Sequence, residues 1–122
     1  MEMPLSEIVD RYTILQLKSQ RIDRGRFAKE LSLYEKALQQ CQQRGLSVKD
    51  EWIEALLEIN GRIWDLEADI RKGKEGKLGL EEVGRRAIAI RDINRERVAM
   101  KNRIAEETGS GFLEYKSNHA SS

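Results

Sequence analysis

Proline, the residue that most strongly interrupts a helix, occurs once in this 122-residue chain, at position 4. The sequence after Pro4 can therefore form long, uninterrupted helices. Apolar residues recur there at steps of three and four, the spacing of one helix face. One such series is Phe27, Leu31, Tyr34, Leu38 and Cys41. The pattern predicts four helices, at about 6–23, 26–44, 47–72 and 80–108.

Small residues mark the ends of these segments. Ser6 and Ser47 are predicted N-caps, because a serine hydroxyl accepts a hydrogen bond from an amide of the first turn. Gly25 predicts a break between the first two helices. Gly45 and Gly109 predict helix ends, because glycine adopts left-handed backbone angles at little cost.

The fold class predicted from these segments is all-α, a bundle of about four helices in a single domain over 1–122. Charged residues make up 35% of the chain and hydrophobic residues 39%, which suits amphipathic helices with solvated outer faces. A chain of this length buries only a small core, so we expect homo-oligomerisation to complete the bundle. The polar tail 110–122 is predicted to be partly disordered.

Overall charge and composition argue against several classes of partner. Lys and Arg total 22 against 21 Asp and Glu, a net charge of +1, so a nucleic-acid partner is not expected. No apolar run approaches the roughly 20 residues of a membrane-spanning helix, and we expect neither a signal peptide nor a membrane partner. The lone Cys41 forms no disulfide within the chain. These features predict a cytoplasmic protein.

Residue types that carry catalysis are sparse. The single histidine, His119, lies near the end of the tail, and Cys41 lies on an apolar seam, so no catalytic residue is assigned. Helix carboxylates offer the one alternative, because facing acids from two helices of a bundle can hold Mg²⁺ for work on phosphates. Such a Mg²⁺-dependent nucleotide hydrolase would use Glu7, Asp10, Asp65 and Asp69. Otherwise no metal or cofactor is expected.

Basic and amide side chains form a second group, and several lie at or beside the apolar stripes. Guanidinium and ammonium groups recognise phosphate or carboxylate, while amides read polar edges and aromatic rings stack. The candidate ligand-binding residues are Lys18, Arg21, Asn60, Trp64, Arg71, Asn94, Arg97, Lys101 and Tyr12. A competing interpretation needs no ligand, because the same bases could form salt bridges with acids of the helices. Those acids are Glu7, Asp10, Asp65, Glu67 and Glu96.

Three segments of the chain resemble a known family. They are Ser6-Glu7-Ile8-Val9-Asp10-Arg11-Tyr12-Thr13-Ile14-Leu15 with Lys18 and Arg21-Ile22; Asn60 with Ile63-Trp64-Asp65-Leu66-Glu67 and Ile70-Arg71; and Asn94 with Glu96-Arg97, Lys101, Gly109-Ser110 and Glu114-Tyr115-Lys116-Ser117. They resemble the motifs of a family of uncharacterised small helical proteins of bacteria and phages, a domain of unknown function. Tyr115 departs from the Glu-Glu-Lys-Ser-Tyr ending of that family. The resemblance implies no activity, but it covers the same polar residues and so favours a polar pocket.

Three functions follow as expectations. The leading one is non-catalytic binding or sequestration of a small anionic, nucleotide-derived ligand. In it, Arg71, Arg97, Lys101 and Lys18 meet phosphates, Asn60 and Asn94 read polar edges, and Trp64 or Tyr12 stacks on a ring. If the chain is phage-encoded, like members of the family it resembles, the expected role of this binding is to sequester a nucleotide signal of host immunity in the host cytoplasm. The alternatives are the Mg²⁺-dependent hydrolase and a structural or adaptor bundle without a ligand.

Overall fold

The computed structural model describes residues 3–74 and 79–109. Its four helices are α1 (Leu5–Arg21), α2 (Arg24–Gln43), α3 (Asp50–Lys74) and α4 (Leu80–Thr108), and the described residues contain no strand. The prediction of an all-α chain of four helices is thus confirmed. The tail 110–122, predicted to be partly disordered, lies outside the described residues.

The N-terminal ends of three helices differ from those predicted. Pro4 occupies the N-cap of α1, and Ser6 is buried inside the first turn. Asp23 caps α2, because its Oδ1 accepts hydrogen bonds from the amides of Gly25 at 2.9 Å and Arg26 at 3.3 Å. The predicted break at Gly25 was therefore wrong, since this glycine lies in the first turn of α2. Ser47 lies ahead of α3 and does not begin it.

The two predicted glycine ends are confirmed. Gly45 has φ 90° just after α2, and Gly109 has φ 62° at the C-cap of α4. Both angles lie in the left-handed region, where a side chain is strained. The amide of Gly109 also bonds to the carbonyl of Ala105 at 2.9 Å, which satisfies one of the last carbonyls of the helix.

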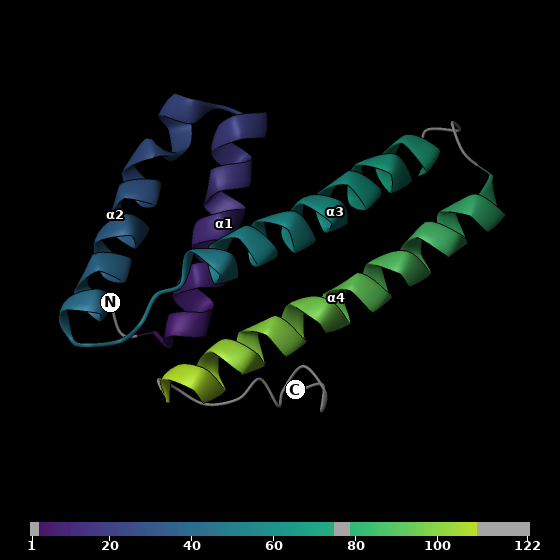
Figure 1. The fold of residues 1–122 in the computed structure, drawn as a ribbon. Helices are drawn as coiled ribbons and strands as arrows, with labels where there is room; N and C mark the ends of the chain where they lie inside the picture. The colour runs from purple at the N-terminus through teal and green to yellow at the C-terminus, as the bar shows by residue number, and fades with distance from the viewer. Residues whose placement is uncertain (1–2, 75–78, 110–122) are drawn as a thin grey trace.

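The helices form two antiparallel hairpins that cross (Figure 1). The shorter hairpin is α1 with α2, and the longer one is α3 with α4. Helix α1 contacts each of the other three helices, whereas α2 packs mainly against α1. Helix α1 therefore lies between α2 on one side and the α3–α4 hairpin on the other. Its second face packs against both α3 and α4.

The hydrophobic core lies where the two hairpins meet. Its buried members come from all four helices: Leu5, Ile8, Val9, Ala37, Leu38, Cys41, Trp52, Leu56 and Ile104. The α3–α4 hairpin extends well beyond this region (Figure 1). Between residues 61 and 92, none of the described hydrophobic side chains is buried. We call the described part of this stretch, 61–74 with 79–92, the outer half of the hairpin.

Among the described residues, none of the four helices contains an apolar stretch that could span a lipid bilayer.

Candidate functional site

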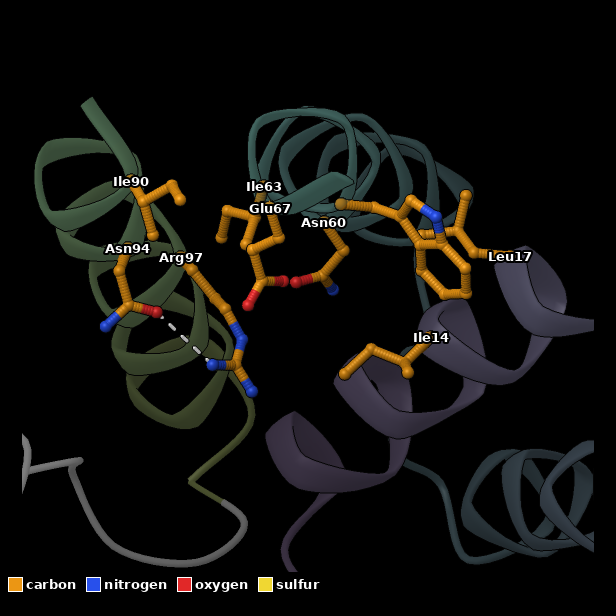
Figure 2. A pocket seen from close by; sticks show the side chains of 9 residues that line it. Ile14, Leu17, Asn60, Ile63, Glu67, Ile90, Asn94 and Arg97 are labelled. Carbon is orange, nitrogen blue, oxygen red and sulfur yellow. Dashed lines mark hydrogen bonds between the residues drawn. The ribbon is translucent and has the colours of Figure 1, made fainter. Parts of the chain in front are cut away.

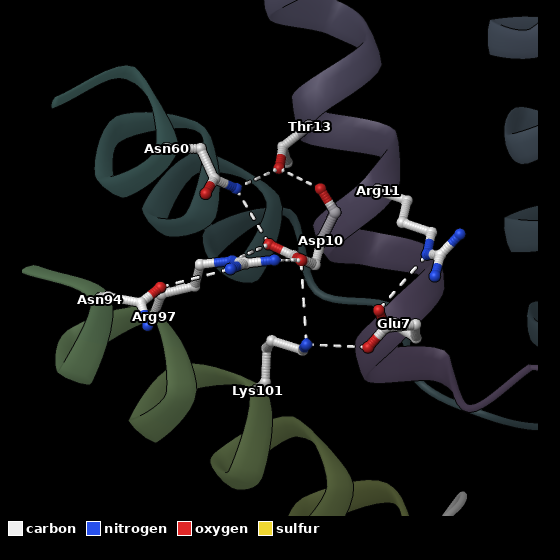
Figure 3. Close-up of polar contacts among 8 residues, drawn as sticks. All are labelled: Glu7, Asp10, Arg11, Thr13, Asn60, Asn94, Arg97 and Lys101. Atoms are coloured by element: carbon white, nitrogen blue, oxygen red, sulfur yellow. Dashed lines mark hydrogen bonds and ion pairs between the residues drawn. The ribbon is translucent and has the colours of Figure 1, made fainter. Parts of the chain in front are cut away.

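A carboxylate with no solvent exposure lies at the centre of the interface between α1, α3 and α4. Oδ1 of Asp10 accepts hydrogen bonds from Nδ2 of Asn60 and from Nε of Arg97, each at 3.0 Å. Oδ2 of Asp10 accepts a second bond from Arg97, at 2.5 Å from Nη2. Asp10 is fully buried. Arg97 thus contacts both oxygens of the carboxylate (Figure 3), and such paired, charge-assisted hydrogen bonds are stronger than bonds between neutral groups.

A second cation joins this centre. The side chain of Lys101 is 6% exposed, and its Nζ lies 2.8 Å from Oε2 of Glu7 and 3.9 Å from Oδ2 of Asp10. Arg11 approaches Glu7 from the solvent side, with Nε 3.3 Å from Oε1. We call Glu7, Asp10, Thr13, Asn60, Arg97 and Lys101 the buried polar network. Its two carboxylates are matched by two cations, which offsets much of the cost of removing the charges from water.

The environment of Asp10 lowers its pKa. Burial by itself raises the pKa of this carboxyl, but the hydrogen bonds and charge of Arg97 outweigh it, with help from Asn60 and Lys101. The result is a pKa below the ordinary value of 3.8. Asp10 is therefore ionised at neutral pH and acts only as an acceptor of hydrogen bonds.

This lowered pKa predicts a pH-dependent stability. Since folding lowers the pKa of Asp10, the unfolded chain binds the proton more tightly, and the stabilisation is fully present above the ordinary aspartate value. It should be lost as pH falls through the lower, folded-state pKa. We expect the free energy of unfolding, measured by urea titration from about pH 5 down to about pH 2, to fall more steeply for the wild type than for Asp10→Asn. Parallel curves would contradict this assignment.

An open cavity of about 310 Å³ lies beside the buried polar network, between α1, α3 and α4 (Figure 2). Its apolar lining combines aliphatic side chains with one indole. Polar groups enter from α3 and α4, and Nη1 of Arg97 bonds to Oδ1 of Asn94 at 3.3 Å. The lining residues are Ile14, Leu17, Asn60, Ile63, Trp64, Glu67, Ile90, Asn94 and Arg97. An apolar pocket with a few converging polar groups is the usual form of a small-molecule site.

Comparison with protein-family models, curated proteins and solved structures gives no match to this chain. The resemblance to the bacterial and phage family therefore stays a prediction.

The structure brings together part of the predicted ligand-binding set. Asn60, Trp64, Asn94 and Arg97 line the cavity. Lys101 lies in the buried polar network instead.

The remaining predicted ligand-binding residues lie elsewhere. Arg21 pairs with Asp65 at 2.6 Å, and its guanidinium lies 5.8 Å from the ring centre of Trp64. Lys18 lines a separate cavity of about 140 Å³ between α1 and α2. Tyr12 packs against the core, and Arg71 is exposed on α3.

The four carboxylates of the predicted Mg²⁺ site each have a cationic partner. Glu7 and Asp10 face Lys101 and Arg97, as described above. Asp65 pairs with Arg21, and Asp69 pairs with Arg86. Within residues 3–74 and 79–109, no group of three or more Asp, Glu, His or Cys side chains could hold a metal ion. The structure thus does not bring these acids to one point.

Two polar members of the site were not predicted in these roles. The hydroxyl of Thr13 accepts from Nδ2 of Asn60 at 3.0 Å and donates to the carbonyl of Asp10 at 2.7 Å. Its position three residues after Asp10 places both on one helix face, and that spacing was the available signal. Glu67, expected to form a salt bridge, lines the cavity and has no ion pair within the described part of the chain.

Proposed function

We propose that this protein binds a nucleotide-derived small molecule in the cavity between α1, α3 and α4 and leaves it chemically unchanged. The observation that carries the proposal is the convergence of Trp64, Asn94 and Arg97 on one open, largely apolar space. A volume of about 310 Å³ lies at the lower end of the range of ligand pockets. It suits a single base or nucleoside, with phosphates placed outside the cavity.

The residues around the cavity support a ligand whose base lies inside the cavity and whose phosphates lie outside it. Trp64 is the aromatic side chain in the lining of the cavity, and stacking on an aromatic side chain suits any base. Arg21 lies above the same indole and pairs with Asp65, whose side chain is 66% exposed. An exposed ion pair contributes little to stability, so a phosphate group can replace Asp65 as the partner of Arg21 at small cost.

The buried polar network holds the cavity in shape before a ligand arrives. Asp10 fixes the guanidinium of Arg97 at two points, and Arg97 in turn bonds to Asn94. A pocket whose polar groups are already ordered loses less conformational entropy on binding.

The test of this function is a nucleotide library screened by native mass spectrometry and thermal shift. We expect one nucleotide per cavity, recovered intact after denaturation, and a raised melting temperature. Trp64→Ala should weaken binding by about tenfold or more, as expected for loss of a stacking contact. Arg91→Ala, on the exposed face of α4, is the matched control and should bind as the wild type does.

Other outcomes of that screen separate the competing functions. A ligand returned hydrolysed only when Mg²⁺ is present would favour the hydrolase. If millimolar nucleotide gives neither a mass adduct nor a thermal shift, nucleotide binding and hydrolysis are both excluded, and the structural or adaptor bundle is the function that stands.

The same mass spectra test the oligomer. We propose that a second copy covers the outer half of the hairpin, where Leu80 is 92% exposed and Ile88 is 53% exposed. Large apolar side chains at such exposure are typical of an interaction surface when they cluster. Sequestration of a host immune nucleotide, and a cytoplasmic location, remain predictions from the sequence and its resemblance.

A further inference from the structure

The orientation of one buried amide decides which hydrogen-bonding groups the cavity offers. Asn60 is 7% exposed, and its Nδ2 donates to Oδ1 of Asp10 and to Oγ1 of Thr13, each at 3.0 Å. Both N–H groups of the amide are thereby used. The ionised Asp10 accepts but cannot donate, so the amide cannot be turned to face Asp10 with its oxygen.

The amide oxygen of Asn60 consequently points away from Asp10 and Thr13. Asn60 lines the cavity, and no hydrogen bond to its Oδ1 is formed by another residue in the described ranges. A carbonyl oxygen on the wall of a pocket can accept a hydrogen bond from a ligand. The cavity therefore carries a fixed acceptor on its α3 side.

Glu67 adds a second acceptor from the same helix. It follows Asn60 by seven residues, two turns of an α-helix, so both lie on one face of α3. Figure 2 shows the carboxylate of Glu67 and the oxygen of Asn60 on the same side of the cavity, opposite Asn94 and Arg97 of α4. A carboxylate accepts two hydrogen bonds side by side and donates none. The α3 wall is thus a surface of acceptors beside the ring of Trp64.

We propose that this acceptor wall selects the base of the ligand and that the base is guanine, a specificity that rests on the proposed nucleotide binding. Guanine is the standard base whose pairing edge carries two adjacent donors, the N1–H and the N2 amine. Glu67 accepts from both. Adenine presents an acceptor at N1, which Glu67 repels, and uracil presents one donor between two carbonyls. Guanine satisfies both oxygens of the Glu67 carboxylate, whereas a base without two adjacent donors leaves at least one of them without a ligand partner.

The experiment compares GMP, IMP, AMP and UMP by isothermal titration on the full chain. We expect GMP to bind at least about tenfold more tightly than AMP or UMP, with IMP, which lacks the N2 amine, in between. Glu67→Gln should weaken GMP binding by about tenfold and leave AMP unchanged or improved, because the new amide can donate to N1. Glu58→Gln, an exposed acid of α3 beside Arg62, is the control and should keep the preference for GMP.

The failures of the two proposals are distinguishable. If AMP or UMP binds as tightly as GMP, or if Glu67→Gln keeps the full preference, guanine selection is overturned while nucleotide binding stands. If none of the four nucleotides binds the wild type, and the wider library also fails, the proposed function falls and the selection falls with it. Equal melting temperatures of wild type and Glu67→Gln establish that the variant is folded.

Discussion

Replacing Arg97 with methionine should lower the free energy of unfolding by about 3–5 kcal/mol, the usual cost of removing one partner of a buried ion pair. Asp10 has no solvent exposure and receives two hydrogen bonds from this guanidinium. Without Arg97, the carboxylate stays buried with Asn60 and with Lys101 at 3.9 Å. The decrease in the free energy of unfolding is measured by denaturation with guanidinium chloride, followed by far-UV circular dichroism.

Two further variants show whether the burial of charge is the cause. Arg95→Met, on the same helix, breaks an exposed pair with Asp92 and should cost less than about 1 kcal/mol. Adding Asp10→Leu to Arg97→Met should recover part of the loss, because a buried ion pair can often be replaced by apolar groups at little cost. If Arg97→Met loses no more stability than Arg95→Met, the ion pair between Asp10 and Arg97 is unimportant for folding.

Trp52→Ala should be about as damaging, at about 3–5 kcal/mol, because it empties a large volume in the core. Trp52 is 1% exposed and belongs to the cluster in which all four helices meet. The ammonium of Lys49 also lies 5.3 Å from its ring centre. Removing the indole therefore weakens the contact between the two hairpins at the point where they cross. Urea titration gives the change.

The second tryptophan of α3 is the natural comparison. Trp64 is half-buried in the outer half of the hairpin, so Trp64→Ala should cost clearly less than Trp52→Ala. Equal losses for the two variants would mean that the outer half contributes as much to folding as the core does.

The helices themselves could be predicted because their signals are local. Apolar spacing and the absence of proline after Pro4 placed all four, and glycine marked two of the ends. The starts were less accurate, because several polar residues ahead of a helix can cap it. Near Gly25 the sequence offers both a glycine, which is typical of a break, and an aspartate, which is a good N-cap, and in the structure Asp23 caps α2.

The site was predictable only in part, because spacing gives the face of a helix but not its partner. Asn60 and Arg97 lie beside apolar stripes, and this correctly indicated that they face the interior. Whether Arg97 meets a phosphate or a carboxylate depends on how α4 is rotated against α1. That rotation is set by packing across the whole interface, and it brings Asp10 to Arg97 across a sequence separation of 87 residues.

The outer half of the α3–α4 hairpin should open locally more easily than the part of the protein where the two hairpins cross. In a single copy of the chain, this part has no buried hydrophobic side chain among its described residues and can separate at a fraction of the energy that global unfolding requires. Amide hydrogens near Ile70 and Val83 would then exchange with solvent long before those near Leu56. Ile63 and Ile90 lie at the border and line the cavity, so a bound ligand would extend the slowly exchanging region outward along both helices.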